Sequence, residues 1–541
     1  MKKVFDNVIR KNLFLIFILI FVLGFEQVMS SVIPYLFGKF IDNILYTKAL
    51  RAVKIFGGIL FIGYVGSIFF ELIHLHLQTV LSEKMGFETK LRLIQNLRKK
   101  KFLEFKKKDA SYLTKRIDQD VDAIYSFILD DLPNLFVLTF CIVYMLFLLF
   151  RIQWIIGLVV LLLIPVYIFI YMLYKDSVQE SEKQMVEKKN ILFQSYNDQL
   201  EYMYNIKLEA KYEEEDNFLH SVFKNALINV KIYLKNMIKM LGGQFTIMGL
   251  SDVGIILLSG YMVYADLITA GQMISIIFLK ERIMAFAKSL YARQKKFFSY
   301  KVAKNRCIEL VEMDEDVIGN EKLSQIDALN TNIVFSYNDN EVVLDDLKID
   351  ANKGEIIIIK GGNGSGKSTF LQLLNGMFTG KGVNITLNGK NLKDLDTDDL
   401  RRNNITNIPQ IIRVKEHSVN EYLYSDKTRA QILEEFNPMT EKDANTLNKF
   451  LDYVENKNID DLSGGERQFL YFVKKMVEPK DLVILDEFSS NLDLDRTNFI
   501  VNYLERIKED HIIILVTHDT RINIKDPKLY TLEKNRRFRV C

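Results

Sequence analysis

The chain has 541 residues, and its charges nearly balance, with 71 Lys and Arg against 68 Asp and Glu. At roughly 150 residues per domain, this length predicts more than one folding unit. The net charge of +3 gives no electrostatic case for nucleic-acid binding, and a hydrophobic content of 49% excludes a largely disordered chain. Cys141, Cys307 and Cys541 are too widely spaced for a disulfide framework or a zinc cluster, which excludes the disulfide-rich secreted class.

Long uncharged runs in the first 305 residues predict a membrane domain. Residues 132–150 and 154–174 approach or reach the roughly 20 residues that a helix needs to cross about 30 Å of hydrocarbon. The three residues between them are short enough only for a tight hairpin. Four further stretches complete a set of six predicted spans, at residues 13–25, 55–70, 240–264 and 267–279. We therefore predict an all-α, six-helix transmembrane domain over residues 1–305.

The first span is predicted to be retained, and the basic residues predict its orientation. A signal peptide ends in a small-residue cleavage site soon after its apolar core, but here the run continues through Glu26 into VMSSVIPYLFG. Segments 81–131 and 175–239 carry runs such as RKKK and KKK, whereas the opposite loops carry few basic residues. Excess Lys and Arg marks the cytoplasmic side. We predict a multi-pass protein of the cytoplasmic membrane, with both termini cytoplasmic and helices that extend into the cytosol.

From about Asn330 the pattern changes to short β-branched runs separated by Gly-, Asn- and Asp-rich turns. Strands are predicted at residues 355–360, 482–485 and 511–516, with helices between them. Short continuous apolar runs are typical of strands buried on both faces of an α/β sheet. We predict an α/β domain over residues 330–541, preceded by a linker at residues 306–329.

A glycine-rich loop follows the first of these strands. Its sequence, GGNGSGKST at residues 361–369, satisfies G-x-x-x-x-G-K-[ST] and precedes a helical run, so the domain is a predicted P-loop NTPase. Glycines let backbone N–H groups cradle phosphate oxygens beside a helix N-terminus. Lys367 places a positive charge at the β/γ-phosphates, and the Ser368 hydroxyl is a predicted Mg²⁺ ligand. The predicted nucleotide contacts in this loop are Gly361, Asn363, Gly364, Ser365, Gly366, Lys367, Ser368 and Thr369.

A second apolar strand, LVIL, ends in two acids. Asp486 is the predicted Mg²⁺ partner of the phosphate loop. Glu487 follows one residue later, where a carboxylate can polarise an attacking water.

Between these elements lies LSGGERQ, residues 462–468, and here the chain resembles the ATP-binding cassette (ABC) family over its whole length. Six spans followed by one cassette resemble the half-transporter layout of exporters. By this resemblance, LSGGERQ is the signature motif and residues 491–493 are the D-loop. The resemblance adds the Q-loop residue Gln410 as a nucleotide and Mg²⁺ contact, His518 as the catalytic switch histidine, Tyr337 as the aromatic on adenine, and Ser463, Gly464 and Gly465 as contacts to the nucleotide of a second cassette.

The resemblance implies an ATPase that binds ATP and Mg²⁺ and couples hydrolysis to export by alternating access. Because one chain carries one cassette, it implies a dimer, and the intact Glu487, His518 and LSGG favour a homodimer over a heterodimer. It also implies that loop helices near residues 106–113 and 206–215 dock on the cassettes. Departures from the family pattern concern communication with the membrane domain rather than ATP chemistry: they are YVENKNIDD before the signature, Phe469 after it, and Tyr422.

Ionisable residues inside the predicted spans are candidates for cargo contact. They are Glu26, Glu71, His74, Asp252, Lys280, Glu281 and Arg282. We predict that Glu26, Lys280, Glu281 and Arg282 line a water-filled cavity and contact a charged or amphipathic cargo. The alternative is that such residues pair with one another to hold the bundle, or that Glu71 and His74 lie near the cytoplasmic surface.

Both charge signs in one cavity favour a small, possibly modified, peptide, as exported by bacterial bacteriocin exporters. We expect no peptidase domain before the first span, so a peptide leader would be processed by another protein. Lipid or multidrug export and import remain alternatives, as does an ATP-gated sensor or immunity component that moves nothing.

Overall fold

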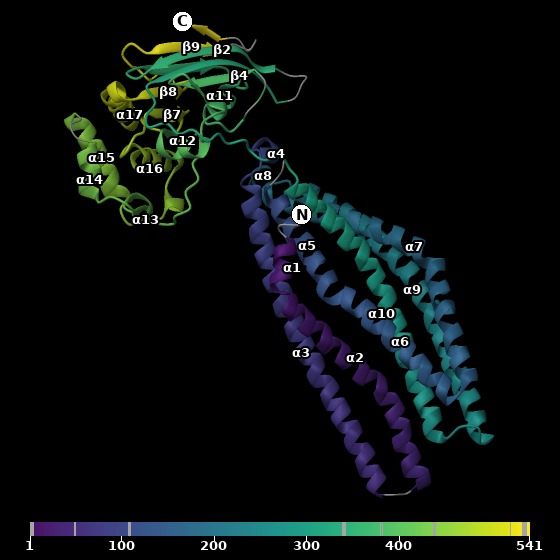
Figure 1. Ribbon diagram of the computed structural model, residues 1–541. Coiled ribbons are helices and arrows are strands. Elements are labelled where there is room, and N and C mark those ends of the chain that lie inside the picture. Colours follow the sequence, from purple (N-terminus) through teal and green to yellow (C-terminus); the bar gives the residue numbers. More distant parts are fainter. Residues whose placement is uncertain are drawn as a thin grey trace. The chain divides into compact units, whose positions relative to one another are not determined.

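The computed structural model describes residues 5–47, 50–106, 110–337, 342–378, 380, 382–436, 440–519, 521–532 and 538–540. The described chain forms two compact units. One is helical and comprises described residues up to 98 together with 110–312, and the other, which contains the sheets, comprises residues 99–109 and 313–541 as far as they are described (Figure 1).

The helical unit contains α1 (Asn7–Lys11), α2 (Leu13–Asp42), α3 (Leu50–Leu97), α5 (Ala110–Ser126), α6 (Leu132–Ile152), α7 (Trp154–Glu201), α8 (Met203–Glu209), α9 (Tyr212–Tyr264) and α10 (Ala270–Val311), with π-helical turns η2 (Asn43–Thr47) and η3 (Phe127–Asp131). Five of the six predicted spans lie in helices that are long and apolar enough to cross a membrane, namely those of α2, α3, α6, α7 and α9. The sixth lies in α10, where Lys280, Glu281 and Arg282 lower the hydropathy of its first half.

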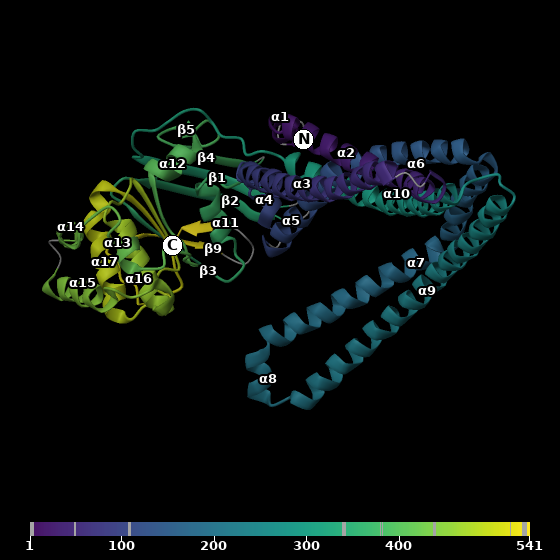
Figure 2. The same ribbon diagram turned by 90° about the horizontal axis from the view of Figure 1, so that it is seen from below.

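Several of these helices are far longer than a bilayer requires. At 48 residues, α7 extends about 72 Å, more than twice the hydrocarbon thickness. It pairs with α9 along its length, and α8 closes the end of this hairpin (Figures 1 and 2). The tight hairpin predicted between the third and fourth spans is confirmed, because α6 and α7 are separated by Gln153, whose backbone is extended.

The other unit contains two sheets. Its strands are β1 (Ala328–Ser336), β2 (Val342–Asn352), β3 (Ile356–Gly361), β4 (Val383–Leu387), β5 (Lys390–Asn391), β6 (Ile405–Ile408), β7 (Leu482–Asp486), β8 (Ile512–Val516), β9 (Lys528–Leu532) and β10 (Phe538–Val540). An antiparallel sheet has the order β2-β1-β4-β5, and the second sheet has the order β10-β9-β3-β8-β7-β6. In the second sheet β9, β3, β8, β7 and β6 are parallel. The three predicted strands are confirmed as β3, β7 and β8, and their isoleucine, leucine and valine side chains are buried throughout, as expected for strands covered on both faces.

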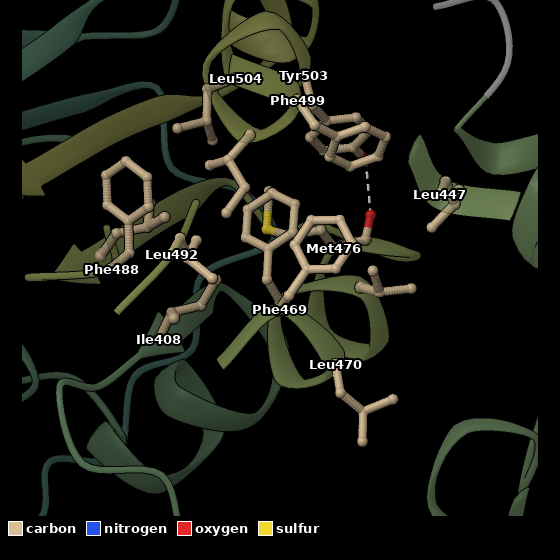
Figure 3. Close-up of a cluster of buried hydrophobic side chains, with 14 of the residues drawn as sticks. Ile408, Leu447, Phe469, Leu470, Met476, Phe488, Leu492, Phe499, Tyr503 and Leu504 are labelled. Atoms are coloured by element: carbon tan, nitrogen blue, oxygen red, sulfur yellow. Dashed lines mark hydrogen bonds between the residues drawn. The ribbon is translucent and has the colours of Figure 1, made fainter. Parts of the chain in front are cut away.

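Helices complete this unit: α4 (Leu103–Lys106), α11 (Lys367–Leu374), α12 (Thr397–Asn403), α13 (Val419–Leu423), α14 (Arg429–Glu435), α15 (Glu441–Val454), α16 (Gly464–Met476) and α17 (Leu494–Ile507). Figure 3 shows the core between α16, α17 and the sheet. Phe469, which departs from the family pattern, is fully buried there, with its ring centroid 4.8 Å from that of Phe450 and 5.3 Å from that of Phe499. The Tyr503 hydroxyl donates a 2.6 Å hydrogen bond to the Met476 carbonyl. The aromatic residue after the signature therefore serves core packing.

The segment that begins at Lys99, just after α3, belongs to the sheet-containing unit, although residues of the helical unit precede and follow it in the sequence. Its backbone pairs with the chain that follows α10: Lys101 N donates to Asp314 O at 3.0 Å, and Asp316 N donates to Lys99 O at 2.9 Å. The Phe102 ring lies 5.8 Å from that of Phe378. Residues 107–109 of the first predicted docking segment lie outside the described residues, and its docking on the cassette stays a prediction.

Candidate nucleotide-binding site

The phosphate loop connects β3, in the interior of the six-stranded sheet, to α11. Gly364 and Gly366 have φ of +76° and +101°, a region that L side chains rarely adopt. At Gly361, a Cβ would lie 2.6 Å from the Leu532 carbonyl oxygen, so the approach of β9 also requires glycine. The loop thus has the backbone freedom that inward-pointing N–H groups need.

Lys367 is buried at the start of α11. Its Nζ donates to the carbonyl oxygens of Gly361 and Gly362, at 2.7 Å and 3.0 Å, and so folds back over the loop. Burial lowers the pKa of Lys367, while the nearby Glu487 and Asp486 carboxylates oppose that shift. The ammonium group is therefore positioned inside the concavity where a phosphate would lie.

Asp486 ends β7 next to this loop. Burial, and then the neighbouring Glu487 charge, raise the pKa of Asp486 to about 6, while Lys367 and a hydrogen bond with Ser368 act in the opposite direction. A carboxylate and a hydroxyl in contact are hard oxygen ligands of the type that Mg²⁺ prefers. A divalent cation would also remove the repulsion between Asp486 and Glu487, so these residues fit the predicted metal.

Glu487 lies in the left-handed region, with φ of +48°, and its N–H is tied to the Val516 carbonyl at 2.8 Å. A non-glycine residue in this region is uncommon and marks a locally strained turn. The turn directs its carboxylate to two other predicted site residues. Gln410 Nε2 donates to Glu487 Oε2 at 2.5 Å, and His518 Nε2 lies 3.7 Å from Glu487 Oε1.

Two residues that sequence reasoning missed support this region. Arg521 donates from Nε and Nη2 to the Asp519 carboxylate, at 2.9 Å and 2.6 Å, and from Nη1 and Nη2 to the carbonyls of Leu492 and Ser489. The hydrogen bonds from Arg521 lower the pKa of Asp519 to about 2. Arg521 therefore joins the turn after His518 to the segment after Glu487. The signal in the sequence was an acid and an arginine two residues apart, Asp519 and Arg521, directly after VTH.

The signature residues begin α16. Ser463 is the N-cap and forms a capping box with Glu466: Ser463 N donates to Glu466 Oε2 at 2.8 Å, and Glu466 N donates to Ser463 Oγ at 3.3 Å. A Cβ on Gly465 would lie 2.2 Å from the Asn491 carbonyl oxygen, so the D-loop packs directly on this glycine. Among the described residues, no hydrogen bond or ion pair links Ser463, Gly464 or Gly465 to the phosphate loop.

Tyr337 follows β1 and contacts α11, the helix that begins within the phosphate loop. Its hydroxyl lies 2.8 Å from Thr369 Oγ1, and its ring meets Phe378 edge-on at a centroid distance of 5.5 Å. The predicted adenine-stacking residue is thus next to the phosphate loop in space, although it is 24 residues before Gly361 in sequence.

The membrane-embedded candidates separate into different environments. Lys280 is 2% exposed and forms an ion pair with Asp252, which is the pairing alternative rather than cavity contact. Glu26 is 8% exposed and accepts a 2.9 Å hydrogen bond from Gln27. Glu281 and Arg282 line a cavity of about 570 Å³ together with Glu71, whereas Glu26 and Lys280 are not among its lining residues.

Comparisons with known proteins place both units of the chain in one family. Residues 15–284 match the family of ABC transporter transmembrane regions, and residues 344–490 match the ABC transporter family. The Lactococcus lactis subsp. lactis "Lactococcin transport/processing ATP-binding protein LcnC-like" is 24% identical over 97% of this chain and 74% of its own length. The Staphylococcus aureus "Putative multidrug export ATP-binding/permease protein SAB1799c" is also 24% identical, over 91% of this chain and 88% of its own length.

Two further matches differ in extent. The Dictyostelium discoideum "Serine protease/ABC transporter B family protein tagA" is 24% identical over 79% of this chain, which spans a quarter of that relative's length. A solved structure of a bacterial Atm1-family ABC exporter with ATP bound has a TM-score of 0.74 and 16% identity, and the match covers 97% of this chain and 94% of that one. The chain belongs to the ABC transporter family, as a helical transmembrane region fused to one ATP-binding, ATP-hydrolysing cassette.

Proposed function

We propose that two copies of this chain form an exporter of the cytoplasmic membrane, which couples ATP hydrolysis to alternating access of a cavity in the membrane domain. The observation that carries this proposal is the convergence of Lys367, Asp486, Glu487 and His518 in one cassette of a chain that also has long apolar helices. Such a complete hydrolytic set would be superfluous in a protein that only binds ATP.

Within one cassette, the proposed division of labour follows the geometry. The backbone of residues 361–369 and Lys367 hold the β- and γ-phosphates. Ser368, Asp486 and the Gln410 amide oxygen would hold Mg²⁺, which neutralises phosphate charge when bound. Glu487 polarises the attacking water. His518, whose Nε2 lies 3.7 Å from Glu487 Oε1, holds that carboxylate in position relative to the γ-phosphate.

We propose that the signature residues act on the nucleotide of the second copy. Ser463 caps α16, and because its own N–H is used by Glu466, the N–H groups of Gly464 and Gly465 at this helix N-terminus are the ones suited to an anion. The absence of bonds between this segment and the phosphate loop of its own chain, among the described residues, supports a site shared by two cassettes. ATP at both interfaces would then stabilise the closed dimer, and hydrolysis would release it.

The cargo we favour is a small, possibly modified, peptide. The lactococcal relative, which is named for lactococcin transport and matches over 97% of this chain, supports a peptide. The name of the staphylococcal relative supports multidrug export as the second candidate. The basic runs in segments 81–131 and 175–239 support cytoplasmic termini and cassettes.

The test uses inside-out vesicles that contain the full chain or its Glu487→Gln variant. ATP-dependent accumulation of a labelled peptide or drug by the wild type, and none by the variant, is expected for an exporter. ATP-dependent loss of preloaded cargo would instead indicate import. A biological phenotype that survives Glu487→Gln would show that the protein acts as a sensor or immunity component without transport.

A further inference from the structure

The cavity between α2, α3 and α10 has a lining of a specific composition. Its volume of about 570 Å³ is in the range of pockets that bind drug-sized ligands. The apolar and aromatic part of the lining comprises Ile33, Pro34, Phe37, Tyr64, Ile68, Phe278 and Ala285. The polar part comprises Ser30, Ser67, Glu71, Glu281 and Arg282.

The single cation of this lining is already engaged. Arg282 Nη2 donates a 2.6 Å hydrogen bond to Ser30 Oγ, and its guanidinium lies 5.0 Å from the centroid of the Phe286 ring. Lys280, the adjacent cation, is withdrawn from the cavity by its ion pair with Asp252. Neither basic group therefore neutralises the cavity carboxylates through a direct ion pair.

The carboxylates, in contrast, are without ion-pair partners. Neither Glu71 nor Glu281 forms an ion pair among the described residues, and both side chains are exposed in the single chain. Glu281 lies 11 residues from the start of α10, about 16 Å along the helix axis. An uncompensated carboxylate at the depth of Glu281 is costly in a membrane and requires a counter-charge.

The backbone adds a further acceptor. Pro34 lies inside α2 and has no N–H, so the Ser30 carbonyl lacks the donor that a helix normally supplies four residues later. Ser30 and Pro34 both line the cavity, so this part of α2 adds acceptor capacity to that of Glu71 and Glu281. The rings of Phe37, Tyr64 and Phe278 in the same lining can pack against an apolar body or stack on a cation.

Building on the proposed function, we infer that this cavity selects cargo with a cationic group, ammonium or guanidinium, joined to an apolar or aromatic body. The cation lies between Glu71 and Glu281, and the apolar body packs on the aromatic rings. Anionic cargo is rejected because two carboxylates outnumber one guanidinium, which is itself held by Ser30.

The experiment measures binding to the full chain in lipid nanodiscs without nucleotide, by equilibrium dialysis against empty nanodiscs. The peptide probes are acetyl-Phe-Arg-amide and acetyl-Phe-citrulline-amide, which have the same shape and differ by one charge. Tetraphenylphosphonium is the small-molecule cation. We expect the arginine peptide to bind about tenfold more tightly than the citrulline peptide, and Glu71→Gln or Glu281→Gln to remove most of that ratio.

Glu83→Gln is the matched control, because Glu83 is an exposed carboxylate of α3 that does not line the cavity. It should retain the ratio. Since the ratio is measured within one preparation, partial misfolding of a variant lowers both affinities without changing it. Binding of tetraphenylphosphonium alone, weakened by the same two variants, supports the cationic chemistry and identifies a small organic cation rather than a basic peptide.

Equal binding of both peptides, with tetraphenylphosphonium unaffected by Glu71→Gln and Glu281→Gln, would overturn the inference. So would the absence of binding by any probe, which is expected if the second copy fills the cavity. Because no ATP is used, failure of this selectivity is distinguishable from failure of the proposed function, which would appear as loss of ATP-dependent transport in vesicles.

Discussion

The side-chain amide of Gln410 donates a 2.5 Å hydrogen bond to Oε2 of Glu487, joining residues 77 positions apart. Gln410 follows β6 and Glu487 follows β7, two adjacent parallel strands, so the pair spans neighbouring carboxyl ends of one sheet. The proposed water-activating carboxylate is thus held by the residue proposed to bind Mg²⁺. Nucleotide with Mg²⁺ would compete for Gln410 and release Glu487 for catalysis.

Replacing Glu487 with Gln should reduce ATP turnover by about 100-fold or more, because the amide cannot accept a proton from water. ATP binding should persist, since the phosphate-loop residues are unchanged. Steady-state ATPase assays and nucleotide-binding measurements on the same preparation test both parts. Glu434→Gln, at an exposed position of α14, is the control and should turn over ATP normally. Turnover by Glu487→Gln at the wild-type rate would contradict the assigned role.

Substitution of the two signature glycines by Ala should have unequal effects on stability. A Cβ at Gly465 would lie 2.2 Å from the Asn491 carbonyl oxygen, whereas a Cβ at Gly464 has no atom nearer than 3.8 Å. Gly465→Ala should therefore destabilise the cassette by about 1–3 kcal/mol, the usual cost of overpacking. Thermal unfolding without nucleotide should show a lower Tm for Gly465→Ala than for Gly464→Ala. Equal Tm values would mean that the D-loop adjusts freely.

Arg521→Ala should lower the ATPase kcat with a smaller effect on KM. Arg521 joins Asp519 to the carbonyls of Ser489 and Leu492 and does not belong to the phosphate loop, so its loss loosens the geometry around His518 and Glu487. We expect a decrease in kcat of about tenfold, the scale of one lost charge-assisted interaction.

Lys525→Ala is the control for this variant, because Lys525 is an exposed cation nearby in the same chain segment.

Low pH should weaken the same Arg521–Asp519 pair in the wild type. The pKa of Asp519 is lowered to about 2, below its ordinary value of 3.8, so the stability from this pair is present above pH 4 and lost as the pH falls toward 2. An unchanged kcat in Arg521→Ala would assign the cluster to packing alone.

The Lys280–Asp252 pair should behave as a structural unit of the membrane domain. Lys280→Met leaves Asp252 without its cation and should cost about 1–2 kcal/mol, less than for a fully buried pair because the Asp252 side chain is 51% exposed. Lys280→Met with Asp252→Asn should recover much of that loss. A double-mutant cycle on Tm in detergent measures the coupling. If Lys280→Met instead leaves Tm unchanged and alters only cargo binding, Lys280 is a cargo contact after all.

Asp486→Asn should stabilise the nucleotide-free cassette in a pH-dependent way. Because the pKa of Asp486 is raised to about 6 from 3.8, ionisation costs stability in the wild type as the pH rises through this range. The Tm of the variant relative to wild type should therefore increase between pH 4 and pH 7, by the equivalent of about 1 kcal/mol after allowance for solvent screening. Asp510→Asn, an exposed control, should show no such trend. A pH-independent difference would contradict the proposed burial of charge.

Much of this protein follows from local sequence pattern. Spans 132–150 and 154–174, the strands EIIIIK and LVIL, and the phosphate loop were predictable because apolar run length and glycine position act within a few residues. The same holds for the acids at the end of β7. Each depends on backbone hydrogen bonding and burial that neighbouring residues impose on one another.

The tertiary structure decided the relationships between distant residues. Lys280 and Glu281 are adjacent in sequence, yet α-helical geometry turns one toward Asp252 and the other into the cavity with Glu71. Likewise, Asn491 meets Gly465, and Arg521 reaches Leu492, only when α16 and α17 pack on the sheet that contains β8. Such pairings depend on which surfaces meet, and no short stretch of sequence contains that information.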